Sequence, residues 1–132
     1  MTTLVRILAP VAPGPGRGQS IQALVDVVHG LNVSWLKAHP DAPRIYSGAV
    51  RYAVEPPHVR ETFATAPAAL VQGWGDCDDL APWRSAELVA RDGVAARPLV
   101  REVRPGLWHV VVRHPDGRLE DPSRLLGMRG PG

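Results

Sequence analysis

The sequence has few of the residues that mark several large classes of protein. It contains one cysteine in 132 residues, so it cannot form an internal disulfide and carries no mark of an oxidising compartment. No apolar run approaches the ~20 residues that a membrane-spanning helix needs. Lysine is almost absent, and the net charge of +2 comes from arginines scattered along the chain without a basic block. We therefore expect no membrane partner and no nucleic-acid partner.

What is present is typical of one small globular domain. Hydrophobic residues make up 45% of the chain and charged residues 21%, and this length can bury a core. A proline- and glycine-rich stretch at 10–18 predicts that residues 1–18 form a flexible, loosely attached arm. Residues 19–128 then form a single domain, and 129–132 a frayed tail. The start of the chain lacks the features of a signal peptide, which favours a cytoplasmic location.

Hydrophobic periodicity predicts helices in the first part of the domain and antiparallel strands in the second, hence an α+β fold. The expected elements are a helix over 20–37 capped by Ser20, a strand over 45–54, a short helix over 68–72, a helix from Cys77 to about 91, strands over 95–103 and 107–113, a hairpin return from 119, and a turn of helix over 124–128.

The strongest candidate for a catalytic segment is Gly73-Trp74-Gly75-Asp76-Cys77. Asp76 is a natural cap for the helix that begins at Cys77, and a helix N-terminus favours the thiolate form of cysteine. Free N–H groups at the helix start also suit an oxyanion. Asp78 and Asp79 act against the thiolate, so they must point away from Cys77 or pair with arginine.

His109 lies in an apolar strand, Trp108-His109-Val110-Val111-Val112. If Pro115 and Asp116 form a type I turn followed by a left-handed Gly117, then His114 pairs with Arg118 and His109 lies opposite Ser123. Asp121 is then one diagonal step from His109 on the same face, and Glu120 points to the other face. A two-residue turn at 116–117 would reverse this parity and bring Glu120 to the histidine instead. The Pro-Asp-Gly order favours Asp121.

These motifs resemble those of transglutaminase-like cysteine proteases, most closely the small proteins of that type encoded in phages and prophages. The resemblance rests on GDCDD at 75–79, WHVVV at 108–112 and EDPS at 120–123, and it covers about residues 70–128. It implies a papain-like α+β core in which Cys77 is the nucleophile, His109 the general base and acid, and Asp121 the residue that orients the imidazole. Glu55 and the segment 50–52 would belong to the upstream part of that core.

The resemblance implies a thiol-dependent amide hydrolase, a peptidase or deamidase, that acts through an acyl-enzyme. Its substrate would be a protein or a peptidoglycan peptide, and its location the host cytoplasm or a virion. Trp74 and Gln72 are candidates for the second oxyanion donor, with packing as the plain alternative for Trp74. Trp83 and Trp108 are expected to be packing residues. No cofactor and no resident metal are expected.

Three other functions remain open at this stage. The chain could be a non-catalytic structural or assembly protein of a phage tail-like particle that keeps the fold, with the arm as its interaction segment. A metal site built from Cys77, His109 and Asp121 is a weaker alternative, because paired cysteines and closely spaced histidines are missing. Redox sensing by Cys77 is also conceivable, although no second cysteine exists to resolve an oxidised thiol.

Overall fold

The computed structural model describes residues 5–9, 11, 13–54 and 61–129. Its elements follow one another as β1 (Arg6–Ala9), α1 (Arg17–Ala38), the short 3₁₀ helix η1 (Ile45–Ser47), β2 (Arg51–Tyr52), β3 (Glu61–Ala64), α2 (Ala66–Gln72), β4 (Trp74–Gly75), α3 (Cys77–Asp92), β5 (Arg97–Arg104), β6 (Leu107–Arg113), β7 (Leu119–Glu120) and α4 (Pro122–Leu125).

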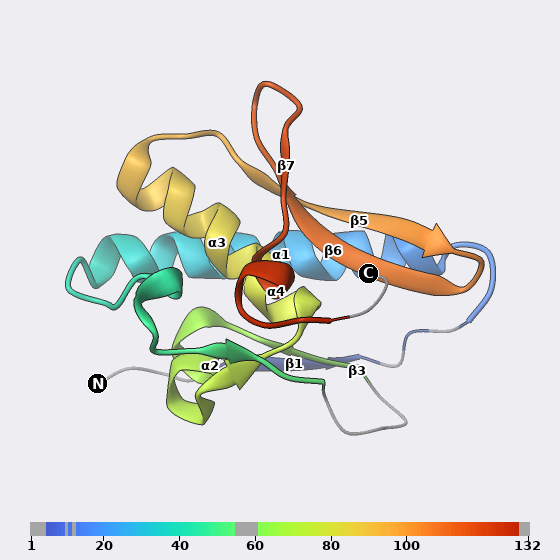
Figure 1. Ribbon diagram of the computed structural model, residues 1–132, viewed down its shortest axis with the longest axis horizontal. Helices are drawn as coiled ribbons and strands as arrows, with labels where there is room; N and C mark the ends of the chain where they lie inside the picture. Colours follow the sequence, from blue (N-terminus) through green and yellow to red (C-terminus); the bar gives the residue numbers. More distant parts are fainter. Residues whose placement is uncertain (1–4, 10, 12, 55–60, 130–132) are drawn as a thin grey trace.

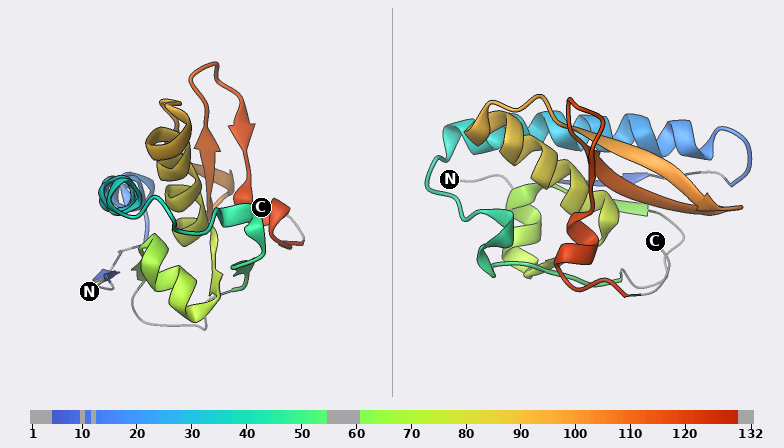
Figure 2. Two further views of the ribbon diagram at one scale, coloured as in Figure 1. Left: turned by 90° about the vertical axis from the view of Figure 1, so that its left-hand side faces the viewer. Right: turned by 45° about the horizontal axis from the view of Figure 1, so that its top comes forward.

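Helix α3 lies in the middle of the molecule, between α1 and the sheet formed by β5, β6 and β7 (Figures 1 and 2). Ten of its residues between Asp78 and Leu88 are buried, among them small side chains such as Ala81 and Ala86 that let neighbouring elements approach closely. A helix that is buried on most of its surface cannot be amphipathic, so its position is set by neighbours on several sides.

The strands form three small sheets. In the first, β6 pairs antiparallel with β5 on one side and with β7 on the other. Strand β1 pairs antiparallel with β3, and β2 pairs in parallel with β4 over two residues. The expected α+β class with an antiparallel sheet is therefore confirmed, and the short parallel pair adds a link that the sequence did not suggest.

The core consists of two groups of buried apolar side chains. The first lies between α1, α3 and β6 and includes Val25, Val28, Phe63 and Val110, and Cys77 packs against it. The second lies between α1, α2, α3 and η1 and contains Trp83, which is fully buried. Trp108 packs against the first group, with Gly18 against its ring. The packing roles expected for these two tryptophans are confirmed.

Three sequence expectations need correction. Helix α1 begins at Arg17 and not after Ser20, because the tight turn at 14–16 closes with a bond from Arg17 N–H to Gly14 carbonyl and leads directly into the helix. The strand expected over 45–54 is mostly absent, because the chain winds into η1 and only 51–52 pair. The arm expected to be loose is attached where it is described, since 6–9 pair with β3 and Ile7 packs against the core.

Some expectations fall outside the described residues, namely those on Glu55 and most of the tail at 129–132. Within the described part of the chain, no helix combines the length and apolar character needed to cross a bilayer.

Candidate active site

Cys77 is the first residue of α3, as predicted, and Asp76 occupies the N-cap position. The chain reaches this point through β4, whose two residues pair with β2: Arg51 with Trp74, and Tyr52 with Gly75. On the other side of β2, Tyr52 N–H donates to the carbonyl of Leu126 just after α4 (3.0 Å). The short parallel pair therefore holds the segment that leads into Cys77 beside the end of the chain.

The hairpin after β6 has the predicted register. Gly117 adopts a left-handed φ of 90°, its N–H bonds the carbonyl of His114 (2.9 Å), and His114 N–H bonds the carbonyl of Arg118 (2.9 Å). The ladder continues to Val112 opposite Glu120 and then stops. The expected pairing of His109 with Ser123 does not form, because Pro122 lacks an N–H and begins α4.

His109 and Asp121 are brought together at the point where the ladder ends. The Nε2 atom of His109 lies 2.8 Å from Oδ2 of Asp121, and His109 is buried. Asp121 is also the N-cap of α4, where its Oδ1 faces Arg124 N–H at 3.4 Å. Burial acts to raise the pKa of Asp121, but the bond from His109 and its charge keep that pKa below the ordinary value.

The sulfur of Cys77 lies against strand β6. The backbone N–H of Val110, the residue after His109, lies close enough to the sulfur to favour the thiolate. Other influences outweigh it: burial, followed by the charge of Asp76, raises the pKa of the Cys77 thiol to about 12. The helix N-terminus favours the thiolate, but burial and the neighbouring carboxylates outweigh it, so the thiol is protonated at neutral pH.

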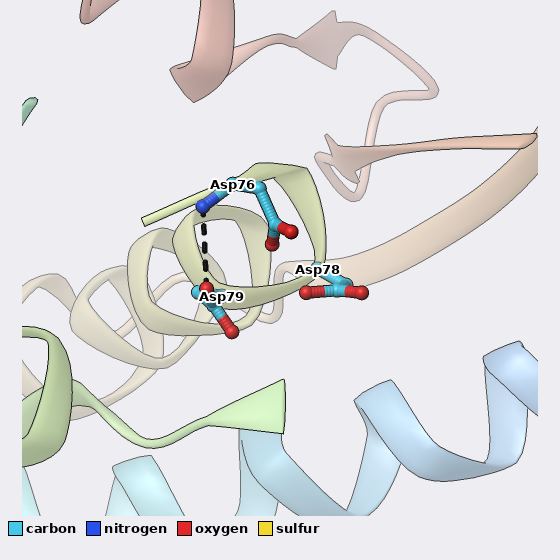
Figure 3. A group of neighbouring side chains, drawn as sticks. All are labelled: Asp76, Asp78 and Asp79. Carbon is cyan, nitrogen blue, oxygen red and sulfur yellow. Dashed lines mark hydrogen bonds between the residues drawn. The ribbon is translucent and has the colours of Figure 1, made fainter. Parts of the chain in front are cut away.

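An acidic cluster of Asp76, Asp78 and Asp79 lies beside Cys77 at the start of α3 (Figure 3). Each offers an oxygen, and these oxygens lie within 4.8 Å of one another. Asp79 accepts N–H bonds from Ala64 (2.6 Å) and Asp76 (3.2 Å), so it joins β3 to the helix start. Asp78 and Asp79 are buried and, among the described residues, neither has an arginine partner, which was one of the two ways expected to relieve their effect on the thiol.

Two members of the acidic cluster, Asp78 and Asp79, hold protons more tightly than isolated carboxyl groups do. Burial is the main cause that raises the pKa of Asp78 and of Asp79 well above the ordinary value, and the charge of Asp76 is the next. One oxygen each of Asp76 and Asp78 is buried without a donor among the described residues, so the two side chains bond each other only when one of them carries a proton. Asp78 and Asp79 therefore take up protons at a higher pH than exposed carboxyl groups do.

The two candidates for the second oxyanion donor differ in their surroundings. Gln72 is already engaged, because its amide nitrogen donates to the carbonyl of Trp74 (2.7 Å) and its oxygen accepts from Arg6 (2.8 Å). Trp74 is partly buried in β4, three residues before Cys77. Its role as a donor stays a prediction, and Gln72 is the weaker candidate.

Tyr52 is a polar neighbour of the site that the sequence argument did not single out. Burial raises the pKa of its phenol, and the charges next in effect belong to Cys77, Asp76 and Asp121. Its position follows from the two-residue parallel pairing of β2 with β4, which joins segments more than twenty positions apart. No local pattern in the sequence signals such a pairing.

Comparisons of the chain with protein-family models, with curated proteins and with solved structures found no match. The resemblance to transglutaminase-like proteases thus rests on the three motifs alone, and the function must be argued from the geometry of the site.

Proposed function

We propose that this protein is a thiol-dependent amide hydrolase that works through Cys77, His109 and Asp121. The observation that carries the proposal is the 2.8 Å bond between His109 Nε2 and Asp121, made on the strand whose next residue, Val110, lies against the Cys77 sulfur. Acyl transfer by a thiol needs a base that a carboxylate orients and that lies within reach of the nucleophile, and the shared strand brings His109 to the side of the molecule where Cys77 lies. A thiol at the start of a helix and a histidine on a strand are what a shortened papain-like core would contain.

The proton transfers follow from the way the imidazole is held. Because Nε2 is bonded to Asp121, Nδ1 is the ring nitrogen left to receive the thiol proton. The sulfur of Cys77 attacks the amide carbonyl carbon as this proton moves to His109. The C–N bond then breaks, the leaving amine takes the proton, and a thioester remains on Cys77. Water, deprotonated by the same nitrogen, attacks the thioester and releases the acid and the free thiol.

The raised pKa of Cys77 determines the type of nucleophilic activation. A thiol with a pKa near 12 is neutral in the resting protein, so attack and proton transfer to His109 occur together and no thiolate–imidazolium pair forms beforehand. The substrate class that agrees with the motifs is a protein or peptidoglycan peptide, in a phage or prophage setting. Hydrolysis is favoured over transfer to an amine, since nothing in the sequence suggests a dedicated amine site.

One observation favours a second candidate function. The burial of Cys77 and the acidic cluster beside it hold the thiol in its unreactive form, as in a protein that has kept the fold and lost the reaction. That candidate is a non-catalytic structural or assembly protein of a phage tail-like particle. The two functions differ in whether His109 controls the chemistry of Cys77.

The test uses p-nitrophenyl acetate, an activated ester that acylates thiols without needing a specific substrate. We expect p-nitrophenolate release at pH 7.5 with an acetyl adduct on Cys77 by mass spectrometry, and a loss of about 100-fold or more in His109→Gln. Asp121→Asn should reduce the rate of Cys77 acylation by nearly as much as His109→Gln does. The matched control is His29→Gln, which removes a half-buried histidine bonded to Ser85 (2.7 Å) and should react like the wild type.

Equal acylation rates in the wild type and His109→Gln would refute the catalytic function. The same holds if the wild type forms no adduct at all, and the assembly function would then be preferred.

A further inference from the structure

Glu120 and Asp121 are adjacent in sequence but have very different surroundings. Asp121 reaches His109, whereas the side chain of Glu120 accepts bonds from three residues on the other side of the hairpin return. The Oε2 atom of Glu120 accepts from Nε of Arg84 (2.7 Å) and from the Tyr46 hydroxyl (2.5 Å), and Oε1 accepts from Nε2 of His114 (2.9 Å). Adjacent residues in an extended chain point to opposite faces. The position of the backbone at 120–121 therefore determines both the bonds of Glu120 and the bond of Asp121 to His109.

The partners of Glu120 are themselves fixed. Arg84 donates to Glu87 through Nη1 (2.9 Å), and its guanidinium lies 5.0 Å from the centre of the Tyr46 ring. Glu87 is fully buried and accepts the N–H of Ile45 (2.9 Å), which ties η1 to α3. We call Arg84, Glu87, Tyr46, His114 and Glu120 the Arg84 network.

His114 is oriented by a second bond. Its Nδ1 atom lies 3.2 Å from Nη2 of Arg118, which can only donate, so Nδ1 accepts and Nε2 carries the hydrogen that Glu120 receives. Burial acts to raise the pKa of Glu120, but the bonds from Tyr46 and Arg84 keep it below the ordinary value. Glu120 is therefore an ionised carboxylate held from three directions.

Strand pairing by itself gives Asp121 little support. Only two residue pairs join β6 to β7, and they end at Glu120. The side-chain contacts of Asp121 are the bond to His109 and the longer one to Arg124 N–H, and a quarter of its side chain is exposed (25%). Its backbone carbonyl accepts the Leu125 N–H (3.2 Å), so α4 holds the chain after Asp121. The hold on the chain before Asp121 comes from Glu120.

We propose that Glu120 is a positioning residue for the site. Through the Arg84 network it fixes the backbone from which Asp121 reaches His109, and so it sets the direction of the imidazole toward Cys77. This inference rests on the proposed function for its catalytic consequence, but the effect on His109 is independent of any reaction.

The experiment compares Glu120→Gln with the wild type by ¹⁵N NMR of the histidine rings, with His109 assigned from His109→Gln. The wild type should show a protected Nε2–H proton on His109, shifted downfield by the Asp121 carboxylate. Glu120→Gln should lose this signal, and acylation of Cys77 by p-nitrophenyl acetate should fall by about tenfold or more, as small displacements of catalytic groups do. Tyr46→Phe removes one donor and should move both readouts less, in the same direction.

The control is Leu36→Ala, which removes a fully buried side chain from the second core group, outside the Arg84 network. Its folded molecules should keep the His109 signal and the acylation rate. An unchanged His109 signal in Glu120→Gln, or an equal loss in Leu36→Ala, would overturn the positioning role. If the signal changes as expected while wild-type acylation does not depend on His109, the positioning role stands and the proposed function fails.

Discussion

Two groups of carboxylates lie on or against α3, and they are compensated in opposite ways. At the start of the helix, Asp78 and Asp79 have no cationic partner among the described residues, and burial raises the pKa of both well above the ordinary value. Further along, Glu87 and Glu120 share Arg84 at 2.9 and 2.7 Å. Carboxyl groups packed at the same helix thus have a raised pKa at Asp78 and Asp79 and a lowered pKa at Glu120.

The group around Arg84 has a fixed geometry, whereas the group beside Cys77 has negative charge without a cation to balance it. A buried carboxylate that is paired and hydrogen-bonded is held in one position, which suits a support for Asp121. An unpaired group of carboxylates is electrostatically unfavourable, and such groups are found more often at functional sites than elsewhere. The unbalanced group is the one beside Cys77.

The largest effect should come from removing the cation that the two glutamates share. Arg84→Met leaves Glu87, which is fully buried, without its charge partner, and should lower the free energy of unfolding by about 3–5 kcal/mol in urea titrations. The control is Arg44→Met, which breaks the exposed pair with Asp92 (3.0 Å) that also joins the η1 region to α3. That loss should stay below about 1 kcal/mol. Similar losses in the two variants would contradict the view that the Arg84 network is a buried support.

The second prediction exchanges a carboxylate for an amide in each group. Glu87→Gln weakens the bond from Arg84 and should cost about 1.5–3 kcal/mol of unfolding free energy at pH 7. Asp78→Asn removes a carboxyl group that is unfavourable when charged, so stability at pH 7 should stay the same or rise. A loss of stability in Asp78→Asn as large as that in Glu87→Gln would show that the two groups of carboxyl groups do not differ in their compensation.

Much of the candidate site could be predicted from the sequence because its determinants are local. Asp76 before Cys77 is a helix start, and the order Pro115-Asp116-Gly117 fixes the hairpin register. From that register the proximity of Asp121 to His109 follows without knowledge of the rest of the fold. The α+β class was predictable for the same reason, since the periods of α1 and α3 and of β5 and β6 are visible in the chain.

The remaining features depend on contacts between distant segments. The pKa of Cys77 is raised by burial, and its sulfur meets the Val110 N–H of a strand 33 positions away, a contact that no local rule encodes. The Arg84 network joins Tyr46 to Glu120 across 74 positions, and Tyr46 lies in a segment that resembled a strand. A capping aspartate signals a helix start, but it does not reveal whether Asp78 and Asp79 are buried.

The third prediction concerns the pH dependence of stability. The folded-state pKa of Asp78 and of Asp79 is raised above the unfolded value of about 4, so the folded state binds more protons. Their contribution is therefore fully present below about pH 4 and is lost as pH rises through the folded-state pKa. Each proton contributes a slope of at most about 1.4 kcal/mol per pH unit. The unfolding free energy of Asp78→Asn should fall less than that of the wild type between pH 4 and 8, measured by urea titration at each pH. Parallel curves would show that Asp78 is ionised in the folded protein.

The smallest effect should be the difference between the two tyrosines of the chain. Tyr46 lies in the Arg84 network, and Tyr52 lies near the acidic cluster. Tyr46 donates to Glu120 but is 38% exposed, so Tyr46→Phe should cost only about 1 kcal/mol. The Tyr52 hydroxyl has no hydrogen-bond partner in the described part of the chain, and Tyr52→Phe should leave the unfolding free energy within about 0.5 kcal/mol of the wild type. Urea titrations at pH 7 give both values. A larger loss in Tyr52→Phe than in Tyr46→Phe would mean that the phenol beside Cys77 is part of a bonded support, and the contrast between the two groups of carboxylates would then have to be redrawn.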